Sequence, residues 1–199
     1  MEIERLSPSD LLYPIPLASG LEKPELAYLG NPEILRQPLL GVLCSVKCPA
    51  TLILKAHDTA RELANQGQAV ISGFQSPVEK EILTMLLRGN GTIILCLARG
   101  LNGMRISKDW RPAIDAGKML VISPFDGQVK RPTDELARQR NHFVATLAAR
   151  ILFIHARPGG SLESLLREML VTEKPFYAIQ NGSNDHLLQQ GAKTWEGGG

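Results

Sequence analysis

The residues best placed to do chemistry follow an apolar run at 151–154, where the chain continues as HARPGGS (155–161). The next residues have helical spacing, so the two glycines stand directly before a helix. The first amide groups of a helix have no acceptor within the helix, and the helix dipole favours a negative charge there. The pattern therefore predicts a phosphate site at Gly159, Gly160 and Ser161, or else an ordinary turn between a strand and a helix.

Glu163 favours the second alternative, because its carboxylate could itself complement the helix dipole and would repel a phosphate nearby. Spacing alone leaves both alternatives open. The chain contains neither GxGxxG nor GxxxxGK[ST]. A dinucleotide site and a P-loop are therefore not predicted.

Basic residues form two groups that the fold could bring to the same place. They are Arg99, Arg105, Lys108 and Arg111 in the first group, and Lys130, Arg131, Arg138 and Arg140 in the second. A shared rim of positive charge would suit a nucleotide phosphate or a nucleic-acid backbone. The alternative is a set of solvated helix faces, balanced by Asp109, Asp115, Asp134 and Glu135.

The residue types that usually carry catalysis or bind metals do not form a signature. No Ser/His/Asp or Cys/His set stands out, and Glu79 and Glu81 fit a helix surface equally well. Cys44, Cys48 and Cys96 lack CxxC spacing, which predicts reduced, buried thiols. We therefore expect no metal and no cofactor, and an enzyme is not the default interpretation.

Composition is typical of a cytoplasmic globular protein. Of 199 residues, 44% are hydrophobic and 21% charged, which suits a single core. No apolar run approaches the ~20 residues that span a bilayer, so no membrane association is expected. The N-terminal MEIERLSPSD lacks the apolar core of an export signal.

From residue 38 onward, short apolar runs alternate with amphipathic stretches. Strands are expected at 38–44, 68–72, 92–97, 119–123, 150–154 and 174–179, and helices at 50–67, 78–88, 108–116, 133–149 and 161–171, with a helical turn at 185–190. Continuous apolar strands that alternate with helices predict a parallel sheet covered on both faces. The expected fold class is α/β: an open, doubly wound, mostly parallel Rossmann-like sheet in a three-layer α/β/α arrangement.

The expected organisation has three parts: an extended N-terminal lead-in at 1–36, a Rossmann domain at 37–195 and a flexible tail at 196–199. Sheets of this class bind ligands beyond the carboxyl ends of their strands. That rule makes Ser45, Gly73, Arg99 and the glycine turn candidates for one binding rim.

One segment carries a family resemblance. RPTDELARQRNHFVATLAARILFIHARPGGSLESLLREMLVTEKPFYAIQ, followed by NDHLLQQGA, resembles the DNA-processing protein A (DprA/Smf) family of the wider group that includes the LOG nucleotide hydrolases. The matching motifs are Arg140-Asn141-His142, Gly160-Ser161-Leu162, Tyr177-Ala178-Ile179 and the segment 184–192. ELAYLGNPEILRQPLLGVLCSVKCPA resembles the family's approach to its first strand, so the resemblance covers roughly residues 20 to 195.

The resemblance implies non-catalytic binding of single-stranded DNA in a basic pocket, in recombination or DNA uptake. It also implies transfer of that DNA to a recombinase, and a homodimer. Carried over by position, the nucleic-acid or phosphate-binding residues would be Ser45, Lys47, Gly73, Arg99, Arg140, Asn141, His142, Gly159, Gly160 and Ser161.

Three departures from the family pattern weaken the expected phosphate contacts. Cys44-Ser45-Val46 replaces a Gly-Ser-Arg, the segment 72–79 replaces a basic loop, and His142 replaces an arginine. Two alternatives follow. One is a nucleotide-binding sensor or LOG-type nucleoside monophosphate hydrolase, although Leu162 and Glu163 occupy that motif's Gly-Thr places. The other is a degenerate paralogue that acts through protein interactions alone.

Overall fold

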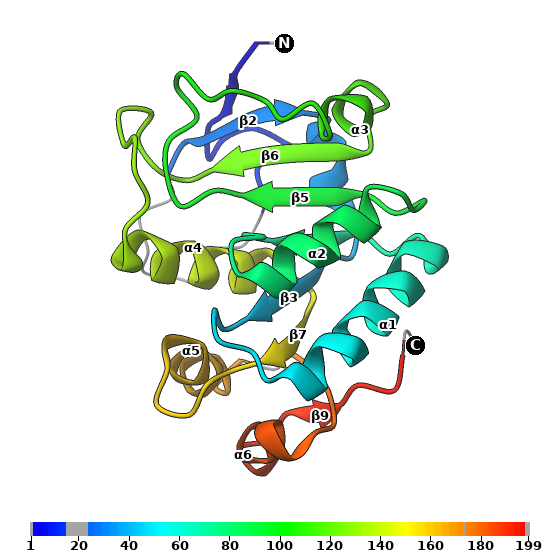
Figure 1. The fold of residues 1–199 in the computed structure, drawn as a ribbon. Helices are drawn as coiled ribbons and strands as arrows, with labels where there is room; N and C mark the ends of the chain where they lie inside the picture. The colour runs from blue at the N-terminus through cyan, green and yellow to red at the C-terminus, as the bar shows by residue number, and fades with distance from the viewer. Residues whose placement is uncertain (1, 15–23, 173, 198–199) are drawn as a thin grey trace.

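The computed structural model describes residues 2–14, 24–172 and 174–197, and Figure 1 shows their fold. One nine-stranded sheet runs through the molecule in the order β1-β2-β6-β5-β4-β3-β7-β8-β9. The strands are β1 (Glu4–Leu6), β2 (Leu26–Gly30), β3 (Leu40–Cys44), β4 (Val70–Ser72), β5 (Ile93–Cys96), β6 (Met119–Ser123), β7 (Arg150–His155), β8 (Phe176–Ala178) and β9 (Lys193–Thr194). From β6 to β9 every pairing is parallel.

Helices cover both faces of this sheet and make two separate apolar layers. They are α1 (Ala50–Gln66), α2 (Pro77–Leu86), α3 (Arg111–Asp115), α4 (Asp134–Leu147), α5 (Ser161–Met169) and α6 (Asp185–Gln189), with two 3-10 helices, η1 (Pro32–Arg36) and η2 (Gly182–Asn184). Buried side chains of α1, α2 and α3 pack on one face, and those of α4, α5 and α6 pack on the other. The predicted three-layer Rossmann-like architecture is confirmed.

The alternation predicted from residue 38 onward is also confirmed, within a few residues at each boundary. β3, β5 and β6 are buried along their whole length, as parallel strands between two helical layers must be. Among the described residues, no helix has both the length and the apolar character needed to cross a bilayer.

The segment before residue 38 contributes strands that the sequence pattern does not indicate. β2 pairs antiparallel with β6, and β1 pairs antiparallel with β2. β2 has the sequence LAYLG and is buried, but its five residues lie close to Pro24 and Pro32 and show no alternation. Local pattern therefore suggests an extended segment, and only pairing with β6 makes it a strand.

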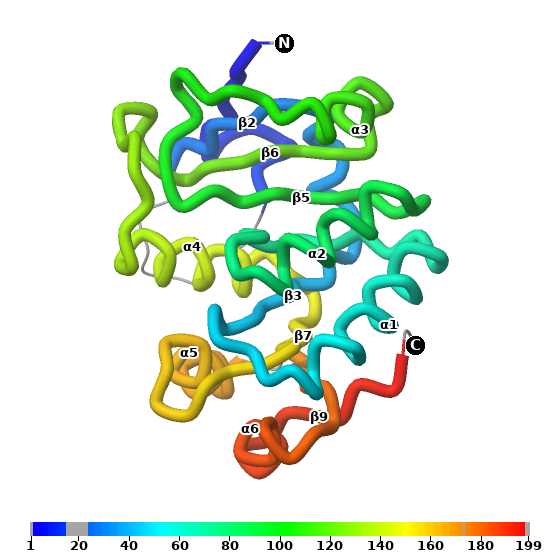
Figure 2. Tube along the Cα trace, in the orientation of Figure 1, coloured from blue at the N-terminus to red at the C-terminus, as the bar shows by residue number. Residues whose placement is uncertain are grey.

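The strand order reverses direction at β3. β4, β5 and β6 follow on one side of it, and β7 and β8 lie on the other. The carboxyl ends of β3 and β7 are thus a topological switch point, where crossovers diverge to opposite faces and leave a crevice. The chain finally returns alongside α1 (Figure 2), and the expected flexible tail at 196–199 lies partly outside the described residues.

Candidate functional site

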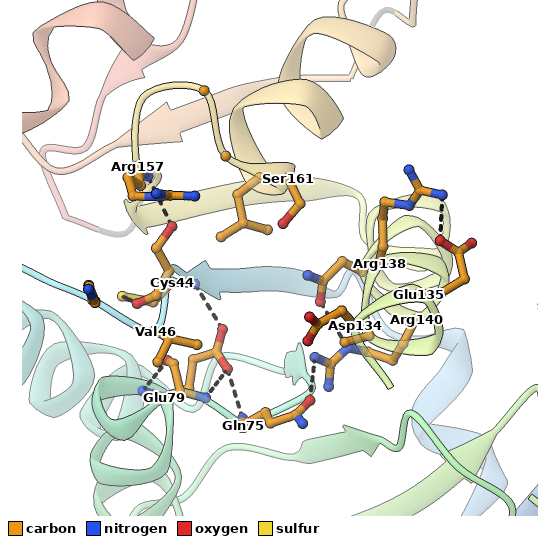
Figure 3. A pocket seen from close by; sticks show the side chains of 18 residues that line it. Cys44, Val46, Gln75, Glu79, Asp134, Glu135, Arg138, Arg140, Arg157 and Ser161 are labelled. Carbon is orange, nitrogen blue, oxygen red and sulfur yellow. Dashed lines mark hydrogen bonds and ion pairs between the residues drawn. The ribbon is translucent and has the colours of Figure 1, made fainter. Parts of the chain in front are cut away.

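A cavity of about 740 Å³ lies at this switch point. Its walls come from the β3–α1 loop, the start of α2, the first half of α4 and the β7–α5 turn. Seven of the sequence-predicted residues line it: Ser45, Lys47, Arg140, Asn141, Gly159, Gly160 and Ser161. Figure 3 shows residues from segments far apart in the sequence facing this common space.

Arg140 forms part of the cavity wall but is 4% exposed. From the middle of α4 its guanidinium donates hydrogen bonds to the Asn141 Oδ1 (2.8 Å), the Cys96 carbonyl (3.2 Å) and the Gln75 Oε1 (3.2 Å). Figure 3 shows the side chain reaching toward Gln75. Most of its donors are therefore used inside the protein, and Arg140 organises the cavity more than it presents a free charge.

Gly73 makes this placement of Arg140 possible. A Cβ built on Gly73 would overlap the Arg140 guanidinium, because that group lies directly against the Gly73 backbone. The sequence analysis assigns both residues to one site, and the structure brings them into contact. The role of Gly73 is to leave room for the arginine.

A carboxylate inside the protein occupies the amide groups at the start of α2. Glu79 accepts from the backbone N–H groups of Cys44 (2.8 Å), Gln75 (2.8 Å) and Ser76 (3.1 Å). Burial raises the pKa of the Glu79 carboxyl, and the nearby Arg140 charge and the three donors oppose that shift. Glu79 is therefore not a surface residue, and it fills a position where an external anion could otherwise bind.

The glycine turn is explained largely by backbone geometry. Gly159 has a φ of +69°, which favours glycine, and a Cβ on Gly160 would lie 2.9 Å from the Arg157 carbonyl oxygen. The Gly159 N–H donates to the Glu163 Oε2 at 2.7 Å. Within the described chain the amides of Ser161 and Leu162 have no acceptor, so part of the helix start stays open to the cavity.

Glu163 gives a testable pH dependence. Hydrogen bonds from Gln190 (2.6 Å) and the Gly159 amide hold the pKa of its carboxyl below the ordinary value. Because folding lowers the pKa of the Glu163 carboxyl, the ionised carboxylate stabilises the folded state above about pH 4.5. This stabilisation is lost as the pH falls through the pKa of the carboxyl in the folded protein. We expect Glu163→Gln to be less stable than the parent near neutral pH, with a difference that shrinks below about pH 4.5. Urea unfolding at several pH values measures this, and a difference that stays constant would contradict it.

The cationic side chains best placed to meet a ligand are Lys47 and Arg157. Both are exposed and line the cavity, and neither forms an ion pair with a carboxylate of the described residues. The Ser45 hydroxyl accepts from the Arg157 N–H at 3.0 Å and so ties the first loop to the glycine turn. Arg157 did not emerge from the sequence analysis, although its place beside the glycine turn was a usable signal.

The rim carries mixed charge. Arg138, Arg140, Lys47 and Arg157 line the cavity together with Glu79, Asp134 and Glu135. Arg138 is paired with Glu135 at 2.5 Å. Of the eight basic residues in the two predicted groups, only Arg138 and Arg140 line this cavity, and Arg138 is balanced by Glu135 on its helix. The free cations of the cavity, Lys47 and Arg157, belong to neither group.

Three predicted site residues, Gly73, Arg99 and His142, do not line this cavity. The His142 Nε2 is 3.2 Å from the Glu168 Oε2. Arg99 lines a second, smaller cavity together with Gly73 and Arg140.

The thiol that lines the cavity is held in its protonated form. Cys44 lines the cavity, but a hydrogen bond with Cys48 and burial raise the pKa of its thiol, so it is no thiolate nucleophile near neutral pH. All three cysteines are free thiols. In the part of the chain that the structure describes, no group of three or more His, Cys, Asp or Glu residues could hold a metal ion.

Comparisons with known proteins agree with this architecture. A structure of DNA processing protein A from Streptococcus pneumoniae superposes with a TM-score of 0.81 at 22% identity, covering 99% of this chain and 72% of that one. A second structure is described as showing the single-stranded DNA binding mode of DNA processing protein A from Helicobacter pylori. It superposes with a TM-score of 0.76 at 18% identity, covering 97% of this chain and 90% of that one. A molybdenum cofactor binding protein from Rippkaea orientalis shares the fold more distantly, with a TM-score of 0.56 at 17% identity, covering 80% and 88%.

A search of curated protein sequences finds no significant match. The family model of DNA recombination-mediator protein A, in contrast, matches residues 5–197, which is nearly the whole chain. The chain therefore belongs to the DNA recombination-mediator protein A family.

Proposed function

We propose that this protein binds single-stranded DNA without catalysis, in the cytoplasm, at the cavity between the ends of β3 and β7. The observation that carries the proposal is the convergence of Lys47, Arg157 and the open amides of Ser161 and Leu162 on one rim. Exposed cations and helix-start amides are the groups that contact phosphate oxygens in nucleic-acid complexes. Family membership and the Helicobacter pylori relative's described binding mode support DNA as the polyanion.

The expected affinity is modest. Three carboxylates line the same cavity, and Glu79 already accepts from the Gln75 and Ser76 amides at the start of α2. With few free cations, the dissociation constant should be on the order of 1–100 μM at physiological salt, as for non-specific binding. Neutralising two phosphates of a single strand corresponds to a slope of about −1.4 in log affinity against log salt.

Fluorescence anisotropy of a labelled oligothymidine at rising salt concentration tests the proposal. We expect binding at low salt and a linear, shallow loss of affinity as the salt concentration rises. Absence of binding at the lowest salt, or an affinity that does not depend on salt, would rule out the DNA proposal.

Hydrolysis of a nucleoside monophosphate has weaker support. Leu162 and Glu163 occupy the Gly-Thr places of the LOG motif. The Glu163 carboxylate bonds to the Gly159 amide and does not line the cavity. The described residues thus lack the arrangement that this hydrolysis would require.

We extend the proposal to the partners that family membership suggests, a recombinase that receives the DNA and a second copy of the chain. Exposed apolar side chains supply candidate contacts for either partner: Val46 is 72% exposed and Val171 is 90% exposed. Val46 also lines the cavity, so a partner bound there would lie close to the DNA.

A further inference from the structure

A second cavity of about 370 Å³ lies beside the first, at the ends of β4 and β5. The two cavities share Gln75 and Arg140, whose side chains are hydrogen bonded to each other at 3.2 Å. This pair therefore stands between the two spaces. A ligand that occupies the first cavity could continue into the second past one hydrogen-bonded pair.

The second cavity has apolar walls and an aromatic ring. Its apolar lining residues are Phe74, Leu83, Leu95, Leu97, Ala98, Trp110 and Pro132. Trp110 is partly buried at the start of α3 and makes no ring pair with the aromatic side chains of the described residues. The volume lies within the usual range for small-ligand sites, and the lining suits a flat, aromatic group.

The charges of this second cavity differ from those of the first. Its ionisable lining residues are Lys80, Arg99 and Arg140, with no carboxylate among the lining residues that the structure describes. Lys80 and Arg99 form no ion pair with any described carboxylate. Apolar walls with two available cations thus suit a group that joins an aromatic ring to a phosphate.

We propose that the second cavity takes a nucleobase of the bound DNA, stacked on Trp110, with Lys80 and Arg99 contacting the flanking phosphates. This inference rests on the proposed DNA binding in the first cavity and adds that the protein also contacts bases. Because the cavities share Arg140 and Gln75, a strand can place its backbone in one and an adjacent base in the other. Stacking tolerates any base, so the site selects unstacked, single-stranded DNA without reading sequence.

An abasic oligonucleotide separates base contacts from phosphate contacts in the unaltered protein. We expect wild-type protein to bind oligothymidine roughly tenfold more tightly than an abasic strand of equal length and charge. Trp110→Ala should remove most of that preference by weakening oligothymidine binding alone, and Trp110→Phe should retain part of it. Trp195→Phe is the control, since Trp195 packs edge-on against Tyr177 and lines neither cavity.

Fluorescence gives a second measurement that leaves Trp110 intact. Because the chain has two tryptophans, Trp195→Phe leaves Trp110 as the only one. Oligothymidine should then quench the emission, and the abasic strand should not. Equal binding and equal emission with both strands would overturn the base site but leave DNA binding in place. Failure to bind either strand would overturn the DNA proposal itself, and the base site with it.

Discussion

Gly73→Ala should lower the free energy of unfolding by about 3–5 kcal/mol, because it displaces a buried guanidinium from its hydrogen-bond acceptors. The new Cβ would occupy the position of the Arg140 guanidinium and displace it. The Cys96 carbonyl would lose its donor, and the buried Glu79 carboxylate would lose its nearby cation. Urea unfolding monitored by circular dichroism measures the loss, and the cavity should change shape with it.

Two comparisons isolate the clash. Gly67→Ala is the control without a clash, because no atom lies within 4 Å of a Cβ built on Gly67. The positive φ of Gly67 (+69°), which Gly73 does not share, should cost only about 1–2 kcal/mol. In an Arg140→Ala background, Gly73→Ala should cost far less than it does alone. An equal cost in both backgrounds would mean that Gly73 does not act by accommodating the arginine.

Removing both free cations of the first cavity, Lys47→Ala with Arg157→Ala, should weaken binding of single-stranded DNA roughly 10- to 100-fold at low salt. It should also reduce the salt slope by about 1.4, corresponding to two lost phosphate contacts. Both side chains are exposed and unpaired among the described carboxylates, so folding should be little affected. Anisotropy titrations at several salt concentrations measure both quantities.

The matched control removes the same total charge from the opposite edge of the sheet. Arg36 and Lys118 precede the amino ends of β3 and β6, away from both cavities. Arg36→Ala with Lys118→Ala should change affinity by less than about twofold at moderate salt. If both double variants weaken binding equally, net charge alone explains the affinity, and the cavity is not the site.

The helices and central strands were predictable because each carries a strong local signal. The helix at 50–67 ends at a glycine, and α1 does end there, with Gly67 in a left-handed conformation. β2 was not predictable in the same way, since its antiparallel partner β6 lies about 90 residues later in the chain. Such pairing depends on distant residues, which local pattern does not contain.

The site was predictable in its location but not in its internal contacts. The rule for strand ends predicts Ser45, Gly73, Arg99 and the glycine turn on one rim. The structure brings Ser45 and the glycine turn to the first cavity and Gly73 and Arg99 to the second. The sequence does not reveal that Arg140 is buried against Gly73, because helix spacing does not determine how far a long side chain reaches. Nor does it reveal that Glu79 bonds to the Cys44 amide, 35 residues away in the chain.

The two margins of the sheet have a consequence for self-association. A long, unpaired outer strand offers a row of free amides and carbonyls on which a neighbouring molecule can extend the sheet. Here the outermost strands are β1, with three residues, and β9, with two. At one margin, β2 and β1 cover β6, so that only the short strand β1 is left unpaired on its outer side. Both outer strands are too short to serve as a template for fibre-like stacking of one molecule on the next.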